Sequence, residues 1–219
     1  MLKKSSVLTA VGAAVAAIAL AAPSATAGTT AAWTVTPSGA FTGSAGVTSL
    51  TDNIGNQIKC ATATASGDAP TSPTAGPQLA SITAAAFNAP CTGPFNSTWE
   101  ISTSTPWTLN GTSYAAGGTN GTGVVTGNIG SISATVTGKS VLGECTFEVT
   151  GSVDAKYNNP SSGGSDGTLD VAPPTTGALL LSIGSKTGPG CNIVGATATF
   201  KGSYSIKHSS GVSPVISYS

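Results

Sequence analysis

The most conspicuous absence from this 219-residue sequence is arginine, and histidine occurs only once. Charged residues of all kinds make up 7% of the chain, with eight basic and eight acidic residues. Nucleic-acid binding requires a basic surface that neutralises phosphates, and docking on anionic lipid requires one too. The composition therefore excludes nucleic acid and anionic lipid as partners. A single histidine also excludes a metal site with several histidine ligands, and we expect neither a metal site nor any other cofactor.

The N-terminus has the three parts of a secretory signal peptide. Lys3 and Lys4 precede an apolar run over 7–22, and Ala25 and Ala27 are the small residues that signal peptidase accepts. The run is short for a bilayer core of ~30 Å and is followed by proline, which disfavours a permanent anchor. We expect cleavage before Gly28, leaving a secreted or cell-envelope-associated chain, 28–219, with no integral membrane segment. Six lysines and eight acidic residues remain in this chain, a net charge near −2.

Helical periodicity is also missing from the predicted mature chain, where alternation of apolar and polar residues dominates. The alternation is clearest over 98–101, 144–150 and 197–206, as in half-buried strands. Further strand candidates, separated by turns rich in Gly, Asn and Pro, are 33–36, 46–51, 57–65, 79–84, 107–110, 123–126, 131–137, 167–171 and 178–183. The pattern predicts an all-β fold, an antiparallel β-sandwich or barrel of about ten to twelve short strands. The Ala-rich stretch 80–87 is the one segment that also fits a short helix.

The cysteine content indicates two disulfides. An even number of cysteines in an exported chain is typical of disulfides, and three connectivities are open to Cys60, Cys91, Cys145 and Cys191. Similar Leu/Ile-containing segments precede the second and fourth cysteines, which suggests two fused, similar halves over 39–110 and 121–208. If the halves are equivalent, the bonds are Cys60–Cys91 and Cys145–Cys191.

Several of these segments resemble those of a known group of proteins. The residues concerned are 91–94, Trp99 and 104–110 in the first half, and 129–136 with Cys145 in the second. They resemble uncharacterised, β-rich, four-cysteine proteins secreted by actinobacteria. This group has no assigned activity, so the resemblance implies a secreted, disulfide-bonded fold and no site residues.

One serine-hydrolase pattern is present but poorly supported. Ser165 lies in a G-x-S-x-G sequence, and Asp170 and His208 follow in hydrolase order. The nucleophile elbow needs a buried strand before the serine and a helix after it, whereas a Gly/Ser-rich loop surrounds Ser165. His208 lies just past a predicted strand and is expected in a solvated turn. We therefore expect no catalytic residues and no enzyme activity.

The acidic residues offer two further possibilities. Glu144 and Glu148 lie on one face of a predicted strand, where four residues at ~3.3 Å each separate them by more than glycosidase carboxylates allow. Asp166 and Asp170, with Asn158 and Asn159, could hold Ca²⁺ in a loop, but no known calcium-loop spacing supports this.

The aromatic residues, 5% of the chain, supply the ligand-binding candidates. Trp99 alternates in phase with Ile101 and is predicted to be core, whereas Trp107 follows a proline at a strand start and is the better surface platform for a ligand. Trp107 and Tyr114 are therefore the candidate ligand-binding residues, and an apolar pocket containing either would indicate a carrier.

Three functions follow from these observations. The leading expectation is a non-enzymatic extracellular or cell-envelope protein, structural, surface-coating or binding. The alternatives are a carrier that holds a small ligand or a carbohydrate in a cleft lined by Trp and Tyr, and a secreted hydrolase.

Overall fold

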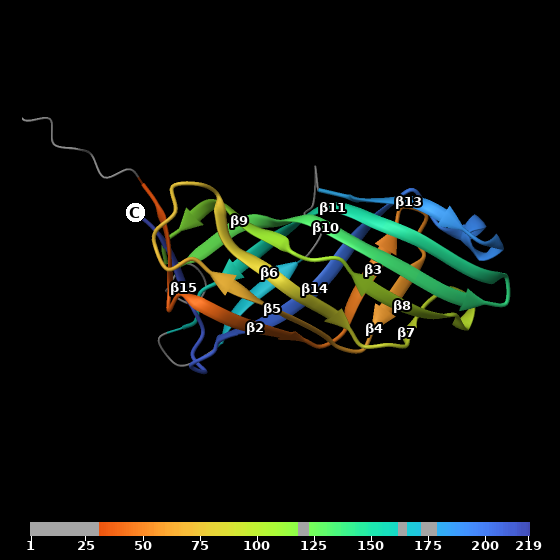
Figure 1. Cartoon of the computed structure of the whole chain (residues 1–219), viewed down its shortest axis with the longest axis horizontal. Helices are drawn as coiled ribbons and strands as arrows, with labels where there is room; N and C mark the ends of the chain where they lie inside the picture. Colours follow the sequence, from red (N-terminus) through yellow and green to blue (C-terminus); the bar gives the residue numbers. More distant parts are fainter. Residues whose placement is uncertain (1–30, 118–122, 162–165, 172–178) are drawn as a thin grey trace, which may run out of the picture.

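The computed structural model describes residues 31–117, 123–161, 166–171 and 179–219 (Figure 1). The predicted signal peptide, 1–27, and Ser165 lie outside these ranges. The described chain forms fifteen strands and two 3₁₀ segments, and none of its helical segments has the length and apolarity to span a bilayer. The elements are β1 (Trp33–Thr36), β2 (Gly39–Ala45), β3 (Thr48–Asp52), β4 (Gln57–Cys60), β5 (Ala63–Ala69), β6 (Gln78–Phe87), β7 (Cys91–Thr92), η1 (Pro94–Asn96), β8 (Thr98–Thr103), β9 (Trp107–Ala115), β10 (Val124–Ser140), β11 (Gly143–Asn158), β12 (Gly167–Val171), β13 (Leu181–Thr187), η2 (Pro189–Ile193), β14 (Thr197–His208) and β15 (Val215–Tyr218).

The strands form a closed, up-and-down ring. Eight segments of the chain follow one another around the ring as antiparallel neighbours, and several of these segments consist of two consecutive strands. In order, they are β2–β3, β4–β5, β6–β7, β8–β9, β10, β11, β12–β13 and β14. The last segment returns to the first, because β14 pairs with both β2 and β3. The all-β antiparallel prediction is confirmed. The ring closes as a barrel does, but its interruptions make it irregular.

The strands are more numerous than the ten to twelve expected, and some are much longer. The predicted strands 123–126 and 131–137 are one 17-residue strand, β10, which crosses the molecule beside β11 (Figure 1). A bulge between Ile129 and Ile132 shifts the buried face from odd to even positions, and Ser131 has a positive φ of 56° there. A bulge adds one residue and reverses the alternation without ending the strand, which is why the sequence suggested two strands.

The Ala-rich stretch 80–87 belongs to strand β6, so the helix alternative is wrong. β6 pairs with β5 on one edge and with β9 on the other. Helix propensity differences are a fraction of a kcal/mol per residue, and pairing on both edges outweighs them. Ala84 and Ala86 are exposed, whereas Ala85 between them is half-buried and faces the interior.

One half of the ring is densely packed and contains both disulfides. Cys60 is bonded to Cys91, joining β4 to β7, and Cys145 is bonded to Cys191, joining β11 to η2. This is the connectivity suggested by the similarity of the two halves. Trp99 packs edge-on to Phe147 with ring centroids 5.8 Å apart, and it is buried as predicted. A side chain at Gly138 would collide with the Trp99 indole, so glycine is required there.

A buried hydroxyl in β3 leads to a stability prediction. Thr48 is 1% exposed, and its Oγ1 has no hydrogen-bond partner among the described residues. An unsatisfied buried polar group costs free energy that an isosteric apolar group does not. We expect Thr48→Val to raise the free energy of unfolding by about 1 kcal/mol in urea denaturation.

The matched control is Thr51→Val on the same strand. The Thr51 hydroxyl accepts a hydrogen bond from Gln57 Nε2 at 3.1 Å, so its loss should leave stability unchanged or lower it. Destabilisation by Thr48→Val would mean that this hydroxyl has a partner in solution.

Candidate functional site

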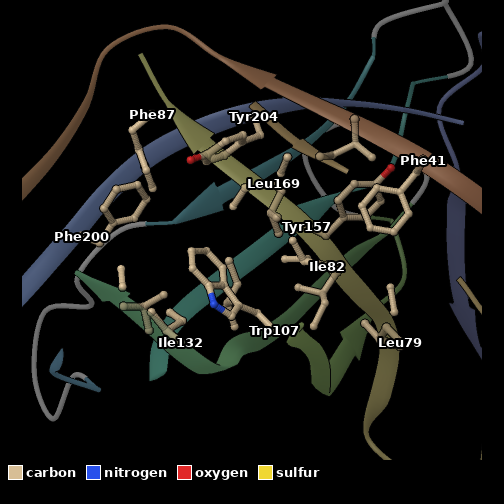
Figure 2. Close-up of a pocket in the computed structure, with 18 of the residues that line it drawn as sticks. Phe41, Leu79, Ile82, Phe87, Trp107, Ile132, Tyr157, Leu169, Phe200 and Tyr204 are labelled. Atoms are coloured by element: carbon tan, nitrogen blue, oxygen red, sulfur yellow. The ribbon is translucent and has the colours of Figure 1, made fainter. Parts of the chain in front are cut away.

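The half of the ring opposite the disulfides encloses an apolar cavity of about 110 Å³. Its walls come from β2, β3, β5, β6, β8, β9, β10, β11, β12, β13 and β14 (Figure 2). The bulkiest lining side chains are Phe41, Ile82, Trp107, Ile132, Leu169 and Tyr204. None of the described residues that line the cavity carries a charge. A void of about 20 Å³ is found in the disulfide-bonded half, so the two halves differ clearly in packing.

A small cap formed by both ends of the described chain covers one end of the cavity. β1 and β15 pair into a two-stranded sheet at one end of the ring (Figure 1). Val35, Pro214 and Ile216 from this cap line the cavity. Trp33 packs on Tyr218 with ring centroids 4.6 Å apart.

Two buried polar side chains hold the C-terminal part of the cap in place. Asn159, fully buried, accepts a hydrogen bond from Ile216 N and donates one to Ile216 O, both at 2.8 Å. The Tyr157 hydroxyl donates to Pro214 O at 2.6 Å. The Asn159 amide thus acts as a strand partner for Ile216, which satisfies backbone groups that would otherwise be buried and unpaired.

The wall of the cavity is interrupted between β6 and β8. Backbone pairing of β6 with β9 ends at Ile82 and Trp107. Beyond that point two hydroxyls bridge the strands, since Thr103 Oγ1 donates to Ala85 O and Thr105 Oγ1 to Thr83 O, each at 2.7 Å. Of the lining residues near this seam, Ala85, Phe87 and Ile101 are only half-buried. Backbone pairing is thus replaced by side-chain hydrogen bonds along this seam, beside three lining residues that are partly exposed.

Three lining residues carry a polar side-chain group. Trp107 Nε1 donates to Ser104 O at 2.9 Å, and Tyr157 is held by Pro214. The third, Tyr204 on β14, is 7% exposed and its hydroxyl has no hydrogen-bond partner among the described residues. Burial raises the pKa of Tyr204, and burial together with the nearby Asp166 carboxylate raises that of Tyr157. Both phenols are therefore neutral at physiological pH.

The two aromatic candidates from the sequence have different positions. Trp107 is 7% exposed and lines the cavity, so the prediction of a surface platform is wrong, because its ring points into the closed ring of strands. The apolar pocket that would indicate a carrier does contain it. Tyr114 on β9 is half-buried against Gly123 and is not among the residues that line the cavity.

The hydrolase candidates have local partners. His208 Nδ1 lies 2.8 Å from Ser210 Oγ, within the turn that ends β14. Asp170 accepts hydrogen bonds from Ser203 and Asn158, at 2.5 and 2.8 Å. The contacts of these two residues thus run to other neighbours and not to each other.

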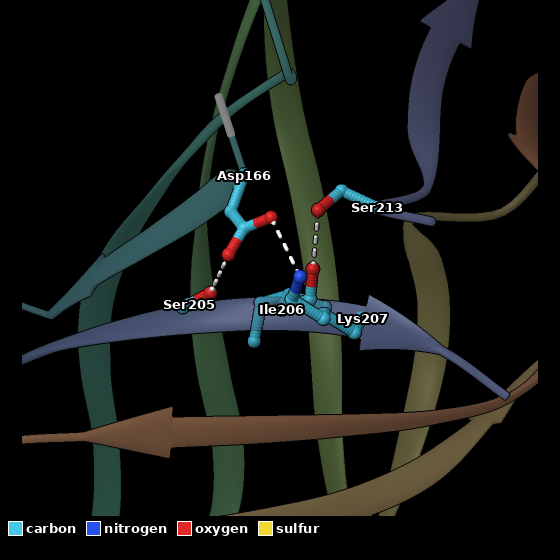
Figure 3. Close-up of polar contacts among 5 residues, drawn as sticks. All are labelled: Asp166, Ser205, Ile206, Lys207 and Ser213. Atoms are coloured by element: carbon cyan, nitrogen blue, oxygen red, sulfur yellow. Dashed lines mark hydrogen bonds and ion pairs between the residues drawn. The ribbon is translucent and has the colours of Figure 1, made fainter. Parts of the chain in front are cut away.

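Asp166 belongs to a polar group on the outside of β12 and β14. It accepts a hydrogen bond from Ser205 at 2.7 Å and pairs with Lys207 at 3.0 Å, and close by Ser213 donates to Ile206 O (Figure 3). The Ser205 hydroxyl and the Lys207 ammonium lower the pKa of Asp166. Asp166 thus joins the start of β12 to β14, and Ser213 joins the segment that follows β14 back to the same strand.

The remaining acidic candidates are dispersed. Glu144 and Glu148 are exposed, between the buried Cys145, Phe147 and Val149. Asn159 bonds to the backbone of Ile216, whereas Asn158 bonds to Asp170. In the described ranges no three His, Cys, Asp or Glu side chains are grouped closely enough to hold a metal ion.

The residues of the site that the sequence did not single out are Tyr157 and Tyr204, and Asn159 was considered only as a possible Ca²⁺ ligand. Tyr204 and Tyr157 do alternate in phase with apolar neighbours, which marks them as inward-facing. Nothing local distinguishes a tyrosine beside a cavity from one in a filled core. A search for related proteins finds no matching family model, no matching curated protein and no matching solved structure.

Proposed function

We propose that this chain is a non-enzymatic protein that binds a small apolar molecule inside the ring. The cavity of about 110 Å³, walled by apolar side chains, is the observation that supports this. An apolar cavity of about 150 Å³ engineered into another protein stays dry and binds benzene or xenon. A ligand of one small ring is therefore the expected size.

The free-energy cost of the cavity also favours this function. At about 24 cal/mol per Å³, an empty space of this size costs about 2–3 kcal/mol. A marginally stable domain has about 5–15 kcal/mol in total. Alanine residues such as Ala65, Ala69, Ala80, Ala85 and Ala134 face the cavity where larger side chains would fill it. A ligand that occupied the space would offset the cost.

The proposal also includes the setting in which the protein works. The predicted signal peptide and the two disulfides support an extracellular or cell-envelope location. The resemblance of 91–94, Trp99, 104–110 and 129–136 with Cys145 to secreted actinobacterial proteins points to the same setting.

The test is binding of toluene, followed through the methyl resonances of lining residues such as Ile82 and Leu169. The variant is Ala85→Leu, which extends carbons into the cavity, and we expect it to lower toluene affinity at least tenfold. The matched control is Ala86→Leu, at an exposed neighbour on the same strand, which should stay within about twofold of the unmodified protein.

Two outcomes would contradict the proposal. If toluene, benzene and indole leave all lining methyl resonances unshifted at millimolar concentration, the cavity is not a binding site. If Ala85→Leu binds toluene as tightly as Ala86→Leu, the ligand occupies another place. Thermal melts of both variants establish that the chain is still folded.

A further inference from the structure

We propose that the bound molecule carries one carbonyl oxygen and that this oxygen accepts a hydrogen bond from the Tyr204 hydroxyl. The inference rests on the proposed function, and it specifies the chemical class of the ligand: a neutral, small, mostly hydrocarbon ketone or aldehyde.

The first support is the unpartnered state of Tyr204. Its side chain is 93% removed from solvent, and none of the described residues hydrogen-bonds to its hydroxyl, which still has some accessible surface. Because an unmade hydrogen bond costs free energy, a hydroxyl that faces accessible space without a protein partner is expected to bond to a polar group that enters that space. Phenylalanine, which lacks the hydroxyl, lines the cavity at three other positions, Phe41, Phe87 and Phe200.

The other polar groups of the wall provide the contrast. Tyr157 and Trp107 already donate to the backbone oxygens of Pro214 and Ser104. Among the described lining residues Tyr204 is therefore the one side chain with a hydrogen-bond donor left for a ligand. A ligand with two separated polar groups would leave one of them unsatisfied, and so a single polar group fits best.

The charge and protonation of the wall decide the kind of polar group. No described lining residue is charged, which disfavours a carboxylate or an amine because a buried charge needs a partner. Burial keeps the Tyr204 phenol protonated and hence a donor. A carbonyl oxygen is satisfied by one donor, whereas a ligand hydroxyl would bring a hydrogen of its own that needs an acceptor.

The direction of the hydroxyl places the ligand. Figure 2 shows the Tyr204 oxygen turned toward Phe87. Phe87 packs edge-on to Phe200 with centroids 5.7 Å apart, and Phe87 lies at the seam between β6 and β8. The carbonyl would thus lie near Phe87, with the hydrocarbon part against the apolar lining residues.

The test compares two ligands of the same shape, cyclohexanone and methylenecyclohexane, which differ by oxygen against CH₂. Their affinities are measured for the unmodified protein, Tyr204→Phe and Tyr157→Phe. We expect Tyr204→Phe to reduce the preference for the ketone, expressed as the ratio of the two affinities, by five- to tenfold. Tyr157→Phe, which removes the other cavity hydroxyl, should change this ratio less than twofold.

A second measurement does not depend on the variant. The carbonyl stretch of bound cyclohexanone should shift to lower frequency relative to its value in hexane, and the shift should disappear in Tyr204→Phe. If both ligands bind but the ratio and the stretch are those of an apolar solvent, the assignment to Tyr204 is wrong and the proposed function stands. If neither ligand binds the unmodified protein, while toluene and indole fail as well, the proposed function itself is wrong.

Discussion

Replacing Cys145 and Cys191 together by alanine is expected to lower the free energy of unfolding by about 4 kcal/mol. The bond closes a loop between residues 46 positions apart, and a cross-link of this span restricts the unfolded chain strongly. It also joins η2 to β11, so its loss should expose the segment around Pro189 first.

Urea denaturation under non-reducing conditions measures this effect. Reduction of the variant that lacks Cys60 and Cys91 breaks only the bond between Cys145 and Cys191, and so provides the control for the alanine side chains. Replacing Cys60 and Cys91, which are 31 positions apart, should cost slightly less. A loss below about 1 kcal/mol on removing Cys145 and Cys191 would contradict the chain-entropy argument for this protein.

Asn159→Ala is expected to lower the free energy of unfolding by about 3 kcal/mol. The variant removes both hydrogen bonds to Ile216 and leaves a buried N–H and a buried carbonyl without partners. Each such group costs about 1–3 kcal/mol. Because β15 pairs with β1, the cap as a whole should loosen, and the end of the cavity that it covers should open.

Hydrogen exchange of the Ile216 amide reports the local effect, and urea denaturation reports the global one. The matched control is Asn158→Ala, one residue earlier. Its amide bonds to Thr168 and Asp170 on a half-buried outer surface, so its loss should cost less than about 1 kcal/mol. Equal costs for the two variants would show that Asn159 does not hold the cap.

The alternation of apolar and polar residues allowed much of the fold to be predicted. In β11 the buried residues Cys145, Phe147 and Val149 and the exposed Glu144 and Glu148 are those that the pattern indicated. The same pattern failed at Ser131, where one extra residue reversed the phase inside a continuous strand. A phase reversal and a strand end give the same local signal, and only pairing with β11 and its neighbours distinguishes them.

The candidate site was less predictable. Trp107 was identified from the sequence as a ligand-binding residue, but as part of a surface platform, whereas it faces the interior. Its orientation depends on closure of the ring through pairing of β14 with β2 and β3, which are more than 140 residues apart in the chain. Residues 104–110 alone therefore do not determine whether the Trp107 side chain faces the interior or the solvent.

What the sequence determined by itself is local or compositional: the all-β class, the even set of cysteines, and the absence of the basic surface that nucleic acid requires. Each follows from residue counts or short-range periodicity, which act whatever the rest of the chain does. The cavity, its cap and the unpartnered Tyr204 hydroxyl were decided by tertiary structure alone. They depend on the volume left when eight segments close around one interior, and on which polar atoms then meet. The volume of the cavity and the pairing of polar atoms depend on residues that are distant in the sequence, because a void exists only where side chains from opposite walls fail to reach one another.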